Sequence, residues 1–146
     1  MSSKPPFVAQ EGSDTCMLAC LRMILTHQET NISEAELLQE ILWEEGGIDP
    51  QQLADLAKRH GLDARAEQLD LGAIIDLVEQ LRFPIVLIDR SVMDREFAVH
   101  AVVPVRVSRH YVTMLDPLRG ERRVSIRKFA KANRKVGGWA VVWHPR

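Results

Sequence analysis

The chain has 146 residues, of which 46% are hydrophobic and 27% are charged, and its formal net charge is −1. This length suits one domain with a substantial core, and the near-zero charge argues against a dedicated nucleic-acid-binding protein. The sequence contains two cysteines, no signal-peptide pattern and no apolar run approaching the length of a membrane span. We therefore expect a single cytoplasmic domain over residues 1–146, with no membrane span and no nucleic-acid partner.

The first half of the chain, residues 1–83, predicts mainly helices. Apolar side chains recur at spacings of three and four from about Thr15 to His27, which predicts a helix capped by Asp14 or Thr15. Capping patterns and glycines mark three further helices, the first of them ended by Gly46-Gly47. These helices are expected at about residues 33–45, 50–60 and 71–81.

The second half, residues 84–146, changes to the pattern of strands. Apolar or alternating runs predict strands at about 84–89, 97–107, 111–115 and 138–143, with a short basic helix at 126–133. Helices that precede strands, with few alternating units, favour an α+β fold with an antiparallel sheet. Pro104 removes an amide donor from the second of these strands, so that strand should lie at an edge or carry a bulge.

Charge is unevenly distributed along the chain. The stretch from Glu29 to Asp49 contains seven acidic residues and no Lys or Arg, whereas the stretch from Arg119 to Lys135 contains eight basic residues and one acidic residue. Two solvated faces of opposite charge would explain this pattern. The alternative is that the basic segment docks an acidic partner.

Cys16 is the candidate nucleophile. It lies at the start of the first expected helix, where unpaired amides and the helix dipole favour a thiolate, and it follows Gln10 by six residues. The side-chain amide of Gln10 and the backbone N–H of Cys16 are candidate donors to an oxyanion. Without a base elsewhere in the chain, Cys16 would be a small core residue.

His100 is the candidate base, because it is the one histidine inside an apolar strand. Asp116 ends the next expected strand, and neighbouring antiparallel strands can bring the two side chains together. A buried histidine satisfied by the core is the competing interpretation. A metal site formed by Cys16, Cys20 and histidines is a further one, but the cysteine spacing matches no common zinc pattern, so we expect no metal and no cofactor.

These motifs resemble the double-glycine leader peptidases, papain-like cysteine peptidases best known as N-terminal domains of bacteriocin-exporting transporters. That family has a Gln six residues before a Cys-x-x-Ala-Cys-Leu-x-Met-Ile block. Its second motif is a His that opens an apolar strand, followed about sixteen residues later by an Asp-Pro-x-x-Gly turn. The matching residues here are Gln10, Cys16, Ala19, Cys20, Leu21, Met23, Ile24, His100, Val102, Val103, Asp116, Pro117 and Gly120.

The resemblance implies a papain-like α+β fold, with a helical subdomain packed on a small antiparallel sheet and the site in the cleft between them. It implies a cysteine peptidase with Cys16 as nucleophile, His100 as base, Asp116 as the orienting residue and Gln10 as oxyanion donor. The implied substrate is a peptide or precursor protein, cut after a leader of Gly-Gly type. No transporter segments follow in the sequence, so we expect a stand-alone version.

Two positions depart from the family pattern. Thr15 replaces the Asp that precedes the cysteine, and Met17 replaces the Gly that follows it, which adds bulk beside the thiol. Two other functions stay open on the sequence. The domain could hold a peptide or partner protein without cutting it, or it could transfer the acyl group of a thioester to an amine.

Overall fold

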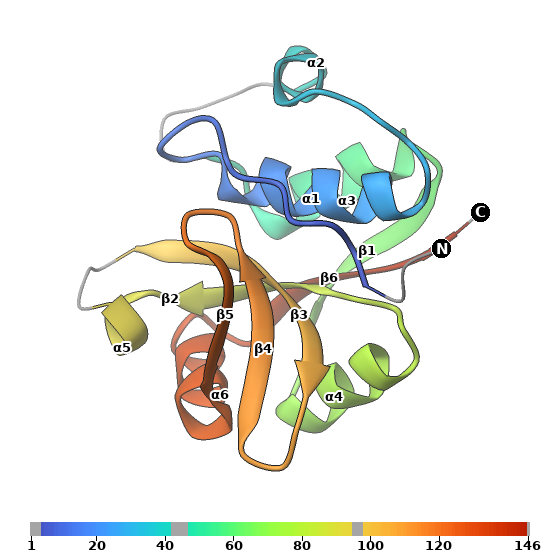
Figure 1. The fold of residues 1–146 in the computed structure, drawn as a ribbon. Coiled ribbons are helices and arrows are strands. Elements are labelled where there is room, and N and C mark those ends of the chain that lie inside the picture. Colours follow the sequence, from blue (N-terminus) through green and yellow to red (C-terminus); the bar gives the residue numbers. More distant parts are fainter. Residues whose placement is uncertain (1–3, 42–46, 95–97, 146) are drawn as a thin grey trace.

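The computed structural model describes residues 4–41, 47–94 and 98–145, which form six helices and six strands (Figure 1). The helices are α1 (Cys16–His27), α2 (Glu34–Gln39), α3 (Pro50–Lys58), α4 (Leu71–Glu79), α5 (Ser91–Asp94) and α6 (Ile126–Lys135). The strands are β1 (Leu62–Gln68), β2 (Ile85–Asp89), β3 (Val99–Val107), β4 (Tyr111–Asp116), β5 (Gly120–Ser125) and β6 (Trp139–Pro145).

The strands form one sheet in the order β1-β6-β2-β3-β4-β5, and every neighbouring pair is antiparallel. Helices α1 to α3 lie together on one side of the molecule, and α4 and α6 lie on the other (Figure 1). Helix α1 packs on β3 and α6 packs on β2, so the middle of the sheet is covered from both sides. All five residues of β2 are buried as a result. The predicted α+β class with an antiparallel sheet is confirmed.

Local signals predicted the starts of the helices well. Ser33 and Asp49 cap α2 and α3 through capping boxes, and Asp70 caps α4. Thr15 occupies the N-cap position of α1 as expected, but its hydroxyl does not cap the helix. It accepts a hydrogen bond from the Gly12 amide at 2.8 Å and thereby closes the preceding loop.

The predicted end of α2 at residue 45 is wrong, because the helix ends at Gln39. The carbonyl of Glu40 accepts a hydrogen bond from Arg59, and its carboxylate lies 2.8 Å from His60 Nε2. These contacts with the residues that follow α3 accompany the end of the helix, and no pattern in the local sequence predicts them. Residues 42–46, including the expected stop at Gly46, lie outside the described residues.

Two strands were missed by the sequence patterns. In β1, Leu62 and Ala64 are buried and alternate with exposed Asp63 and Arg65, but the small alanine gives a weak signal. Strand β5 was hidden in the basic segment, because its sequence Gly-Glu-Arg-Arg-Val-Ser has one strongly apolar side chain. The single helical turn α5 was also not predicted.

Pro104 marks a bulge, which is one of the two predicted outcomes. The register between β3 and β4 shifts between Pro104 and Arg106. The other outcome, an edge strand, is wrong because β3 lies between β2 and β4. The pairing of β3 with β2 runs only from Val99 to Val102, so Pro104 has no neighbour on that side that needs its missing amide.

Candidate active site

The start of α1 places Cys16 at the surface of a cavity. Leu18, Ala19 and Cys20 are fully buried and fix the helix on the core, whereas Cys16 is partly exposed. Burial raises the pKa of the Cys20 thiol well above its ordinary value, with smaller contributions from the charges of Cys16 and Asp116. Cys20 is therefore a core residue, and Cys16 is the accessible thiol.

The loop before α1 is tied to the turn that follows β4. The Gln10 backbone N–H donates to the carbonyl of Pro117 at 3.0 Å, and Figure 1 shows the two segments side by side. The Gln10 side chain donates through Nε2 to the Gly12 carbonyl at 2.7 Å, and its buried Oε1 has no hydrogen-bond partner among the described residues. Gln10 does not line the cavity beside Cys16.

Glu34 also shapes this loop, and it was not among the residues predicted from the sequence. The residue is buried, and its Oε2 accepts a hydrogen bond from the Glu11 amide at 3.1 Å. Its position in the acidic stretch suggested a solvated carboxylate. The signal that could have found it is spacing. Glu34 directly follows the Ser33 cap and lies three residues before the buried Leu37, so the two side chains share one face of α2.

His100 and Asp116 meet as predicted. Strand β3 pairs with β4 through Val103 and Leu115, which puts His100 and Asp116 on the same face, one diagonal step apart. His100 Nε2 lies 2.7 Å from Asp116 Oδ1, and both side chains are buried. The Leu118 amide donates to the same oxygen at 2.9 Å, which fixes the carboxylate plane.

The surroundings of His100 favour its protonated form. Burial by itself lowers the pKa of His100, but hydrogen bonds with Asp116 and Cys16, together with their charges, raise it from 6.5 to about 9. Because Asp116 occupies Nε2, Nδ1 is the ring nitrogen left for the Cys16 thiol. The three side chains thus form a connected series.

Asp116 is held in its ionised form. Burial raises its pKa, but hydrogen bonding and charge from His100, the Leu118 amide and the Arg122 side chain outweigh burial, and the pKa is lowered. Arg122 Nη1 lies 3.3 Å from Asp116 Oδ2. Arg122 was not singled out from the sequence. A β5 strand following the Asp116-Pro117 turn would have placed it on the same face as Asp116.

The cavity beside Cys16 has a volume of about 530 Å³ and lies where α1 and α3 begin and β2 ends. Met17 and His100 line it together with Cys16, and Leu118 and Val99 form an exposed apolar part of its wall. The remaining lining residues are Ser13, Asp14, Gly47, Ile48, Asp49, Pro50, Leu87, Arg90 and Ala98.

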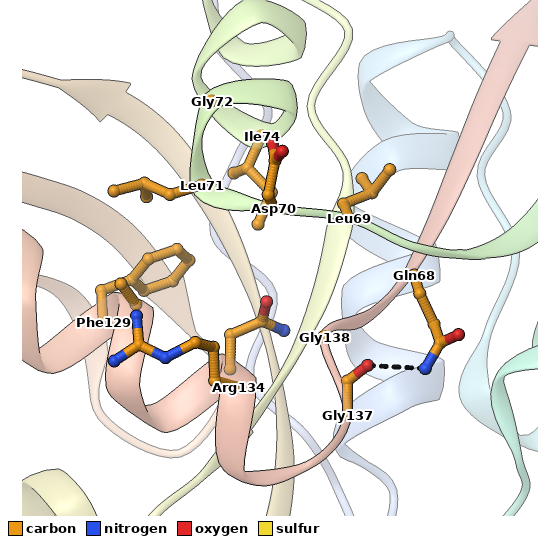
Figure 2. A pocket seen from close by; sticks show the side chains of 12 residues that line it. Gln68, Leu69, Asp70, Leu71, Gly72, Ile74, Phe129, Arg134, Gly137 and Gly138 are labelled. Carbon is orange, nitrogen blue, oxygen red and sulfur yellow. Dashed lines mark hydrogen bonds between the residues drawn. The ribbon is translucent and has the colours of Figure 1, made fainter.

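A larger cavity of about 690 Å³ lies elsewhere, between the start of α4 and the end of α6 (Figure 2). Gln68 and Gly137 are joined by a hydrogen bond at its rim, and Asp70 and Arg134 are its charged residues. The described residues that line it include no cysteine or histidine, so this cavity offers no thiol chemistry.

No group of three or more His, Cys, Asp or Glu side chains that could hold a metal ion occurs in residues 4–41, 47–94 and 98–145. Across these same ranges, each helix is too short or too polar to cross a membrane.

A cysteine peptidase needs a thiol, a base within its reach and a group that orients the base. The start of α1 and strands β3 and β4 bring such groups together, on a fold of helices packed against an antiparallel sheet. Fold and site together define the class of papain-like cysteine peptidases.

The model of the peptidase C39 family matches residues 4–136. The chain belongs to this family and is a cysteine-type peptidase, which confirms the resemblance seen in the sequence. No curated protein matches the sequence significantly.

Solved structures of C39 peptidases have the same fold. A C39-like peptidase from Bacillus anthracis is 18% identical with a TM-score of 0.82, covering 99% of this chain and 96% of that one. The peptidase domain of Streptococcus ComA, a bifunctional ABC transporter involved in quorum sensing, is 21% identical with a TM-score of 0.78, covering 96% and 98%. A double-glycine motif protease from an AMS/PCAT transporter, solved with its leader peptide, is 17% identical with a TM-score of 0.77, covering 99% and 94%.

Proposed function

We propose that this peptidase cuts a precursor peptide after a leader of Gly-Gly type, and that Cys16, His100, Asp116 and Gln10 carry the reaction. The observation that carries the proposal is the buried His100–Asp116 pair beside the accessible Cys16 thiol at one cavity. The C39 family match supports a peptide substrate, as does the leader peptide bound to a structural relative.

In the proposed reaction, His100 already holds the Cys16 proton, in keeping with its raised pKa of about 9, and the thiolate attacks the carbonyl carbon of the scissile peptide bond. The oxyanion of the tetrahedral intermediate accepts hydrogen bonds from the Cys16 backbone N–H and the Gln10 side chain. His100 then protonates the leaving amine, which breaks the C–N bond and leaves a thioester on Cys16. A water molecule, deprotonated by His100, hydrolyses the thioester and restores the thiol.

The start of α1 supports the Cys16 backbone N–H as an oxyanion donor. No described side chain caps the first turn of α1, so the Cys16 amide is not engaged by a cap. The Gln10 side-chain amide donates to the Gly12 carbonyl and lies outside the cavity, so as a second donor it would exchange that bond for the substrate oxygen and turn toward Cys16.

Met17 supports the preference for glycine. Its side chain lines the cavity next to Cys16, where the family pattern has no side chain. A substrate residue without a Cβ fits beside this added bulk more readily than any other.

Labelling and turnover with a synthetic Gly-Gly leader peptide test the proposal. We expect iodoacetamide to modify Cys16 faster at neutral pH than a free thiol, and Cys16→Ala to abolish cleavage while Cys20→Ala retains it. The proposal fails if Cys16 reacts no faster than a free thiol and Cys16→Ala leaves turnover unchanged. Mass spectrometry of products formed with an added amine separates hydrolysis from acyl transfer, and binding without any product would identify a non-cleaving domain.

We propose that residues 1–146 act as one domain in the cytoplasm, where a reducing environment keeps the Cys16 thiol free.

We also propose that the basic segment from Arg119 to Lys135 binds an acidic partner. Its support is a row of exposed cations on α6 that form no ion pair with any described acidic side chain: Arg127, Lys128, Lys131 and Arg134.

A further inference from the structure

Asp116 is the centre of a row of charged side chains that continues beyond His100. Its Oδ1 accepts hydrogen bonds from His100 and the Leu118 amide, at 2.7 and 2.9 Å. Its Oδ2 faces Arg122, whose Nη1 lies 3.3 Å away. Because Asp116 is almost completely buried, its negative charge depends on these partners in place of water.

Strand register explains why two charged groups converge on one carboxylate. Strand β4 lies between β3 and β5, and Asp116 is its last residue. Gly120 of β5 lies opposite Asp116, so Arg122 lies on the same face, one diagonal step away. His100 reaches the carboxylate from the other side, from β3.

Arg122 also forms an ion pair with Asp94. Arg122 Nη1 lies 3.1 and 3.2 Å from the two carboxylate oxygens of Asp94, which ends α5. The Asp94 side chain is 8% exposed, and Arg90 and Arg119 approach it at 3.7 and 3.6 Å. The Arg122 guanidinium therefore contacts the buried carboxylate of Asp116 and the nearly enclosed carboxylate of Asp94, a geometry that fixes its position more firmly than a surface ion pair would.

We propose that Arg122 is a positioning residue for the peptidase reaction: it keeps the Asp116 carboxylate ionised and turned toward His100, and Asp94 anchors it. The inference rests on the roles proposed above for His100 and Asp116. Without Arg122, Oδ2 of Asp116 loses its charged donor, and the carboxylate rotates and takes up a proton more readily. A misplaced Asp116 no longer orients the imidazole toward the Cys16 thiol.

Kinetics of three variants test this role against a purely structural one. In Arg122→Gln we expect kcat for the leader peptide to fall about tenfold, which corresponds to the same free energy as a shift of one pKa unit. KM should stay within about twofold of the wild-type value. Arg122→Lys keeps the charge and should stay within about threefold of wild type. Arg123→Gln is the matched control, because Arg123 is the next residue of β5 and faces the opposite side, with its guanidinium 4.6 Å above the Tyr111 ring.

An NMR titration of the Asp116 carboxyl carbon gives a second readout that needs no turnover. Loss of a nearby positive charge should raise the pKa of Asp116 in Arg122→Gln, and leave it unchanged in Arg122→Lys and Arg123→Gln. This readout also separates the two proposals. Persistent cleavage by Cys16→Ala would refute the function, whereas an unchanged Asp116 titration in Arg122→Gln would refute the positioning role.

A double variant separates positioning from folding. Arg122→Gln leaves Asp94 with one fewer cation, which destabilises the fold, and Asp94→Asn relieves that buried charge. We expect Asp94→Asn/Arg122→Gln to be more stable than Arg122→Gln and equally slow. The inference is overturned if the double variant regains wild-type kcat, or if Arg122→Gln and Arg123→Gln both stay within twofold of wild type.

Discussion

At the scale of single residues, the ionised His100–Asp116 pair makes the folded state sensitive to pH in two directions. The folded state binds the His100 proton more tightly than the unfolded chain does, since its pKa rises from 6.5 to about 9. The stability that this provides is fully present below about pH 6.5 and is lost as the pH rises through 9. For Asp116 the pKa is lowered, so its contribution is present above about 3.8 and is lost as the pH falls.

We therefore expect the free energy of unfolding to decrease between pH 6.5 and 9, by up to about 3 kcal/mol for a shift from 6.5 to about 9. Urea denaturation at a series of pH values measures this change. His100→Gln, which cannot titrate, should show a flatter profile over the same range. An equally steep decrease in that variant would contradict the assignment to His100. Burial raises the pKa of Cys20 above its ordinary 9.0, so its effect on stability lies at still higher pH.

Met17 is the departure from the family pattern that lines the cavity beside Cys16. In Met17→Ala the cavity beside Cys16 becomes wider, so substrates with Ala in place of the Gly before the scissile bond should fit better. We expect the ratio of kcat/KM for the Ala peptide to that for the Gly peptide to rise about tenfold. The ratio is its own control, because a general loss of activity affects both peptides. An unchanged ratio would exclude Met17 from specificity.

At the scale of elements, the starts of the helices were predictable because caps act within one turn. Asp70 shows this most simply, since its carboxylate accepts a hydrogen bond from the Ala73 amide at 2.8 Å at the start of α4. The end of α2 was not predictable, because Arg59 and His60 lie about twenty residues further along the chain from Glu40.

Asp70→Ala should lower the free energy of unfolding by about 1 kcal/mol, because it removes the side-chain cap of α4. Asp76→Ala is the matched control, since Asp76 is exposed in the same helix and alanine favours helix there. Thermal or urea denaturation compares the two. Cleavage by both variants should equal that of wild type, because neither residue lines the cavity beside Cys16.

At the scale of the whole molecule, strand β6 joins the two halves of the chain. It pairs with β1 from the first half on one side and with β2 from the second half on the other. Trp143 of β6 strengthens this connection, because its buried Nε1 donates to the Phe83 carbonyl at 2.7 Å, just before β2. Because α1 packs on β3 within this sheet, Cys16 and His100 keep a fixed position relative to each other.

We expect Trp143→Phe to lower the free energy of unfolding by about 2 kcal/mol, because it leaves the buried Phe83 carbonyl without its donor. Trp139→Phe is the control on the same strand. Trp139 is 37% exposed, and its replacement should change stability by less than about 0.5 kcal/mol. Equal losses in both variants, measured by urea denaturation, would show that the hydrogen bond is not the cause.

The amino-acid sequence by itself determined the peptidase class, the accessible thiol at a helix start and the His100–Asp116 pair. The class rests on the resemblance of the Cys16 and His100 motifs to a known family, whereas the thiol and the pair depend on short-range rules, namely periodicity and the pairing of adjacent strands through a tight turn. Only the tertiary structure decided that Glu34 is buried, that α2 ends early and that Arg122 donates a hydrogen bond to Asp116. Each of these depends on a contact between segments distant in the sequence or on strand β5, whose charged residues conceal its alternation. Burial and register, which set the energy of such charged contacts, are properties of the assembled sheet and not of any local segment.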